Sequence, residues 1–161
     1  MTRRPYALGI VALLCLAAPT SFATDVDTAG IGQLFANLEK GIREAREALF
    51  KKGWYPESYT KNLVGGSGLA GEQVYRQGTR KHWYLKPDLK KLRTTGRGSP
   101  FLVPCDIWSW KQSKAVDHVW AALIWQGKAW VILGAGEKLA QVEALARRYQ
   151  EKKPLAPSRE Q

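Results

Sequence analysis

Cys105 and His118 are the first residues whose types could do chemistry, as the nucleophile and base of a cysteine hydrolase. Such a pair must lie within hydrogen-bond distance. The two residues fall in consecutive predicted strands. If these strands form a hairpin with Trp110 opposite Asp117, the two lie four residues apart along the sheet, or roughly 13 Å. This separation makes a cysteine cell-wall hydrolase the weakest of the candidate functions.

A secreted, metal-free ribonuclease is the second enzyme that the residue types allow. It needs a carboxylate and a histidine for proton transfer, and basic side chains that bind phosphate. These types are present as Glu72, Arg76, Arg80, His82 and His118. The same residues are also ordinary in a solvated, charged sheet edge. We therefore keep this set as an alternative and assign no catalytic residue.

Aromatic residues interleaved with basic ones indicate a binding surface instead. Such side chains stack on sugars or bases, or anchor protein interfaces. Alternation along a strand places Trp108 and Trp110 on one face with Asp106. Tryptophan is rarely fully buried, so we expect some of the seven tryptophans to face outward. The predicted contact surface comprises Trp54, Tyr55, Arg76, Arg80, Lys81, His82, Trp83, Tyr84, Trp108 and Trp110.

The sequence predicts neither a metal site nor a cofactor. The histidines and cysteines lack the spacing of metal ligands. Residues 66–71, GSGLAG, formally match a dinucleotide-binding fingerprint. That fingerprint works only between a strand and a helix, and the residues after it look like a strand. We therefore interpret 66–71 as a flexible loop.

The first 23 residues are typical of a signal peptide. Arg3 and Arg4 precede an apolar stretch, and small residues precede a predicted cleavage site after Ala23. Removal of this segment lowers the net charge from +11 to +9 and leaves Cys105 as the remaining cysteine. The mature chain cannot form an internal disulfide, and it has no apolar run long enough to span a membrane. We therefore expect a periplasmic or secreted protein.

The elements that position these groups belong to one α+β domain over residues 24–153, followed by a disordered polar tail over 154–161. An antiparallel sheet of about five strands is expected between an N-terminal and a C-terminal amphipathic helix. Apolar periodicity predicts these helices over 28–52 and 137–152. The predicted strands are 72–77 and 80–86, a hairpin around Gly78-Thr79, then 105–110, 117–125 and 128–134, with a short helix over 88–93.

The last two strands, 117–125 and 128–134, are apolar on both faces, which predicts a central position in the sheet. The turn Gln126-Gly127 places Trp125 opposite Lys128. Two helices are too few to cover both faces of this sheet. The uncovered apolar surface favours a partner.

These observations together predict a small, basic, exported binding protein rather than an enzyme. An inhibitor or immunity-type protein, or an accessory of an envelope secretion system, fits them. The expected partner is another envelope or secreted protein. An anionic polymer is an alternative, as is a second copy that docks through the apolar sheet face or is bridged by Cys105.

Overall fold

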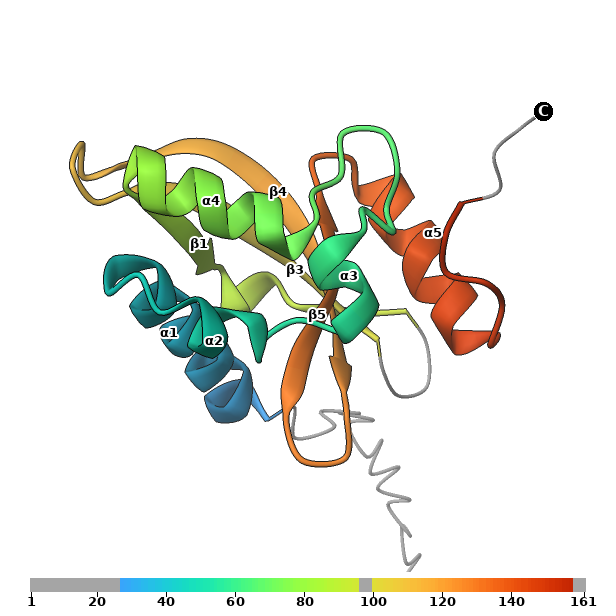
Figure 1. Ribbon diagram of the computed structural model, residues 1–161. Helices are drawn as coiled ribbons and strands as arrows, with labels where there is room; N and C mark the ends of the chain where they lie inside the picture. The colour runs from blue at the N-terminus through green and yellow to red at the C-terminus, as the bar shows by residue number, and fades with distance from the viewer. Residues whose placement is uncertain (1–26, 96–99, 158–161) are drawn as a thin grey trace, which may run out of the picture.

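The computed structural model describes residues 27–95 and 100–157 (Figure 1). An antiparallel five-stranded sheet is packed against helices, so the predicted α+β fold is confirmed. The strand order is β1-β3-β4-β5, and β2 pairs with β3. The bounds are β1 Trp83–Pro87, β2 Arg93–Thr94, β3 Phe101–Ser109, β4 Lys114–Trp125 and β5 Trp130–Gly136. The predicted signal peptide, and residues 158–161 of the predicted tail, lie outside the described residues.

Helices pack on both faces of the sheet. Their bounds are α1 Thr28–Arg43, α2 Glu47–Lys51, α3 Pro56–Thr60, α4 Gly71–Lys81 and α5 Leu139–Gln150. One core lies between the sheet and α1, α2 and α4, where Phe50, Val74 and Val103 are buried. A second, smaller core lies under α5, around Leu102 and Leu145. In Figure 1, α1, α2 and α4 lie together toward one end of the molecule, and α5 lies at the other.

The predicted helix over 28–52 is two helices. The chain turns at Ala45, which has a left-handed φ of 52°, and the Arg46 N–H donates to the Gly41 carbonyl at 2.7 Å. This turn brings α2 back against α1 so closely that a Cβ at Gly41 would lie 2.9 Å from the Cβ of Phe50. Glycine permits that approach because it has no side chain.

The predicted hairpin over 72–86 is wrong, because its first strand and its turn are helix α4. Gln73 caps the start of this helix by accepting a hydrogen bond from the Ala70 N–H at 3.0 Å. Val74 and Gly78 are buried on one side of the helix, against the core. The helix ends at His82, which has a left-handed φ of 61°, and β1 follows directly. The buried residues Val74 and Gly78 are four apart, which is the spacing of one side of a helix. The charged residues on the outer side make this pattern hard to recognise in the sequence.

The short helix predicted over 88–93 is a single 3-10 turn, η1, Leu89–Lys91. Asp88 caps this turn by accepting a hydrogen bond from the Lys90 N–H at 3.2 Å. Arg93 belongs to β2 instead. The helix thus begins where the sequence predicts it and ends earlier.

Next to the turn, the register of the last hairpin differs from the prediction by two residues, and beyond a register shift between Ala122 and Leu123 it differs by three. Trp125 pairs with Trp130, and the Gln126 N–H donates to the Ala129 carbonyl at 2.9 Å. A shift of two residues keeps each side chain on its predicted face. β4 and β5 therefore have apolar side chains on both faces, as predicted, although the turn is longer.

The cover of the sheet also differs from the prediction. Helix α4 adds cover to one face, and α5 covers the Leu102 end of the other face. The remainder of that second face, over β1, β3 and β4, carries basic and aromatic side chains rather than aliphatic ones. None of the helices in residues 27–95 and 100–157 is long and apolar enough to cross a membrane.

Candidate functional site

The part of the second sheet face that α5 leaves uncovered is the first candidate site. We call it the basic aromatic face, and it comprises Arg43, Tyr84, Lys86, Arg93, Asp106, Trp108, Trp110, His118 and Trp120. Strand alternation builds it, because Asp106 and Trp108 of β3 are half-buried while their neighbours Cys105 and Ile107 are buried on the other side.

Each aromatic ring of this face lies beneath a cation. The Lys86 Nζ lies 4.1 Å from the centroid of the Trp108 ring. The Arg93 guanidinium lies 5.2 Å from the Trp120 ring. Arrangements of this kind are attractive because the negative face of the ring meets a positive charge. The cations are therefore held in place before any partner arrives.

The same arrangement recurs at the β1 edge. The Arg43 guanidinium, from the end of α1, lies 5.3 Å from the Tyr84 ring and 5.0 Å from the Trp110 ring. The Tyr84 and Trp110 rings stack with their centroids 6.1 Å apart, and the edge of His82 meets Trp110 at 5.5 Å. Glu39 holds Arg43 from its other side through an ion pair of 2.8 Å. This corner is an ordered group of rings with one guanidinium over it.

A histidine and a carboxylate are paired in the middle of the face. Asp106 and His118 are directly opposite each other on β3 and β4. The His118 Nδ1 lies 2.7 Å from the Asp106 Oδ1, and their side chains are 77% and 44% exposed. Lys86 is opposite Asp106 on its other side. The face therefore carries a carboxylate, Asp106, between Lys86 of β1 and His118 of β4.

The predicted contact residues separate into several places. Trp108 and Trp110 lie on the basic aromatic face, where Tyr84 is buried with 8% exposure and His82 adjoins the Trp110 ring. Trp54 is buried in the core with 2% exposure. Tyr55 lies against Tyr149 of α5, with ring centroids 6.4 Å apart. The remaining four contact residues lie on α4 or at the start of β1: Arg76, Arg80, Lys81 and the buried Trp83.

The contact surface predicted from the sequence lacks the cations Arg43, Lys86 and Arg93. One signal was available for Lys86, which lies two residues after Tyr84 in a strand and must share its face. No local signal identifies Arg43 or Arg93, because they reach this face from α1 and from β2. Only the tertiary structure brings them onto the rings.

The ribonuclease set does not assemble. Glu72 forms an ion pair with Arg76 in the first half of α4. His82 follows the end of the same helix, ten residues away, or about 15 Å at 1.5 Å per residue. His118 lies on the basic aromatic face, where its carboxylate partner is Asp106 rather than Glu72. The described structure brings neither histidine to Glu72.

Cys105 and His118 are closer in register than predicted, and still do not meet. Cys105 pairs with Val119, so His118 is its next neighbour along β4, and the predicted 13 Å separation along the sheet is wrong. The two side chains nevertheless lie on opposite faces. Burial raises the pKa of the Cys105 thiol, and the charge of Asp106 adds to this effect. A thiol with 1% exposure offers no surface for a bridge between folded copies.

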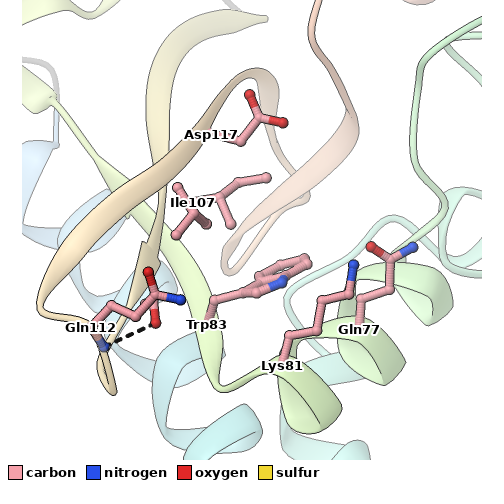
Figure 2. A pocket seen from close by; sticks show the side chains of 8 residues that line it. Gln77, Lys81, Trp83, Ile107, Gln112 and Asp117 are labelled. Carbon is pink, nitrogen blue, oxygen red and sulfur yellow. Dashed lines mark hydrogen bonds between the residues drawn. The ribbon is translucent and has the colours of Figure 1, made fainter.

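A second candidate site is a pocket on the other side of the β3–β4 hairpin (Figure 2). We call it the hairpin pocket, and it is lined by Gln77, Lys81, Trp83, Ile107, Ser109, Gln112, Val116 and Asp117. Its volume is about 530 Å³. Figure 2 shows Lys81 and Gln77 rising from α4 beside the Trp83 indole, with Asp117 on the side of Ile107.

The structure offers no metal centre within residues 27–95 and 100–157, because no three His, Cys, Asp or Glu side chains cluster there. The GSGLAG loop is followed by a helix, α4, so the strand predicted after it is wrong. No strand precedes this loop among the described residues, however, and Gln73 already occupies the Ala70 N–H. The strand–loop–helix context of a dinucleotide site is therefore not met.

Comparison with protein-family models, with curated proteins and with solved structures finds nothing that matches this chain.

Proposed function

We propose that this chain is an exported binding module that docks an acidic protein through the basic aromatic face. The observation that supports it is the set of cations lying on aromatic rings over β1, β3 and β4. Interface hot spots are enriched in tryptophan, tyrosine and arginine. Cations that are already held on rings lose little freedom when a partner binds, which favours affinity.

The charge pattern favours a folded protein over a uniform polyanion. Asp106 lies opposite Lys86 in the sheet, and its negative charge repels a polymer with an anion at every unit. A protein surface can place a carboxylate opposite each cation and a donor opposite Asp106. Base stacking is also disfavoured, because the cations occupy ring faces that nucleotides would need.

The test is a photo-crosslinking experiment with the mature chain and an extract of the cell envelope of the source. A photoreactive residue replaces Trp108, and in a separate sample it replaces Trp125, which is exposed but far from the face. We expect one acidic protein to be crosslinked from position 108 and not from position 125. The crosslink should weaken with added salt, since the cations are exposed.

Charge-reversed variants make this test specific. Lys86→Glu with Arg93→Glu should abolish the crosslink, and Lys40→Glu with Lys138→Glu, at exposed cations elsewhere, should leave it intact. Equal loss in both variants would show a nonspecific charge effect. Retention of a purified polyanion instead of a protein would overturn the choice of partner. Export is tested separately by detecting a mature chain that begins at Thr24.

A further inference from the structure

The hairpin pocket is independent of the proposed function, because it lies on the opposite side of the sheet from the basic aromatic face. Its floor is apolar, since Trp83 and Ile107 are 5% and 6% exposed. Polar groups surround this floor. A volume of about 530 Å³ lies within the usual range for sites that bind small molecules.

Two opposite charges face the pocket from different elements. Lys81 comes from the last turn of α4, and Asp117 comes from β4. Among the described residues, no ion pair joins them, and neither pairs with another charged side chain within 4 Å. The Asp117 Oδ1 accepts a hydrogen bond from the His118 N–H at 2.7 Å, which orients the carboxylate.

A β-bulge shapes the wall that carries Asp117. Ile107 pairs with Asp117 and Trp108 pairs with Ala115, so Val116 is an extra residue on β4. Bulges change the direction in which side chains point and are frequent beside functional sites. Val116 is 43% exposed and lines the pocket together with Asp117.

Uncharged hydrogen-bonding groups complete the lining. The buried Ser109 hydroxyl accepts from the Gln112 N–H at 3.2 Å, and among the described residues its own hydrogen has no acceptor. The side-chain amides of Gln77 and Gln112 also line the pocket. These groups can donate to and accept from a polar ligand between the two charges.

We propose that the hairpin pocket binds a small zwitterion, an amino acid or a short peptide with free ends. The ligand carboxylate meets the Lys81 ammonium, the ligand ammonium meets the Asp117 carboxylate, and an apolar ligand side chain packs on Trp83. A simple anion is attracted by Lys81 but repelled by Asp117. A simple cation is attracted by Asp117 but repelled by Lys81. A neutral ligand pairs with neither charge.

The test is a titration of the whole mature chain, followed by NMR at the indole N–H of Trp83, which the Trp83→Phe spectrum assigns. The probes are leucine, leucyl-leucine and their N-acetylated and C-amidated forms. We expect saturable shifts for at least one free-ended probe, with a Kd below about 10 mM. Each blocking group should weaken binding about tenfold or more, because it removes a charge-assisted contact.

The two free-ended probes separate the two sources of this chemistry. Tighter binding of leucine assigns the pocket to amino acids, and tighter binding of leucyl-leucine assigns it to short peptides. Blocked and free probes that bind equally would overturn the zwitterion assignment. Absence of any shift at about 10 mM of every probe would overturn the site itself.

Variants assign each charge to its group. Lys81→Met should weaken binding of the free-ended probe. It should also abolish the loss of affinity (the penalty) that C-amidation causes, while the penalty that N-acetylation causes stays. Asp117→Asn should do the reverse. Lys40→Met and Glu137→Gln, at exposed charges outside the pocket, should change neither penalty. If both pocket variants change the losses of affinity caused by C-amidation and N-acetylation in the same way, the assigned orientation is overturned. A normal circular dichroism melt of each variant excludes unfolding as the cause.

Discussion

Lys86 has two neighbours that could hold it, and the structure selects one. Asp106 is directly opposite Lys86 in the register of β1 and β3, as an opposite charge in a cross-strand pair would be. The Lys86 Nζ instead lies over the ring of Trp108, 4.1 Å from its centroid. Among the described residues, no Lys86–Asp106 contact falls within 4 Å, and Asp106 binds His118. Two double-mutant cycles therefore distinguish the arrangements.

The first cycle combines Lys86→Met with Trp108→Leu, and the second combines Lys86→Met with Asp106→Asn. Cation–π pairs at exposed sites contribute about 0.5–1 kcal/mol, and Trp108 is half-buried, so we expect a coupling energy in this range for the first cycle. The second cycle should give less than about 0.3 kcal/mol, as exposed charges out of contact do. Methionine keeps the length of the lysine stem, so both cycles remove mainly the charge.

The assay is equilibrium urea unfolding followed by far-ultraviolet circular dichroism. With a urea m-value of about 1–3 kcal/mol per M, a coupling of about 0.5–1 kcal/mol corresponds to roughly 0.2–1 M in the urea midpoint, which is measurable. Repeating both cycles in about 0.5 M NaCl adds a second criterion, because salt screens exposed ion pairs strongly. A coupling that is larger with Asp106 than with Trp108, and that disappears in salt, would refute the cation–π arrangement.

Three further predictions test the rest of the fold. Burial raises the pKa of the Cys105 thiol, so a thiol reagent at about pH 8 should label the native chain only as fast as it unfolds. Cys105→Ser should lower the unfolding free energy by about 1–3 kcal/mol, because it buries a hydroxyl at this position. The buried Tyr59 hydroxyl donates to Glu47 at 2.6 Å, and burial, then Glu47, raises its pKa above the ordinary 10.0. A raised folded-state pKa stabilises the fold fully below pH 10 and less as the pH rises above it, so urea midpoints should fall above pH 10, and Tyr59→Phe should reduce that fall. Gly78→Ala should cost about 1–3 kcal/mol in urea unfolding, because its Cβ would lie 2.6 Å from a backbone carbonyl, while Arg80→Ala on the outer side of α4 should cost less than about 0.5 kcal/mol.

The sequence predicted faces better than pairings, and the size of each register error explains why. The error between β4 and β5 is two residues next to the turn, so Leu123 still shares a face with Ile132, as predicted. The error between β3 and β4 is three residues, which reverses the face of every residue on one strand. His118 was therefore predicted on the face of Cys105 and lies on the face of Asp106. The bulge at Val116 and a turn shorter than predicted between β3 and β4 cause this error, and neither has a signal in the sequence.

Helix α4 shows a different failure, in which the element itself is predicted wrongly. The predicted strand 72–77 contains Glu72 and Arg76, and in the structure these two form an ion pair one turn apart on a helix. Residues four apart share a face in both elements. The sequence predicts Gly78 in a turn, whereas it is buried where α4 approaches Trp83 and Ile42. A glycine between polar residues does not reveal which of these roles it has.

The two candidate sites share strands β3 and β4 but not their side chains. Asp117 faces the hairpin pocket and the next residue, His118, faces Asp106 on the other side, because strand residues alternate. Ser109 and Trp108 divide in the same way. A substitution on either face therefore changes one site and leaves the other in place. Lys86→Glu with Arg93→Glu should lose the protein partner and keep ligand binding. Asp117→Asn should weaken ligand binding and keep the partner. The two results together would establish two independent binding functions on one hairpin.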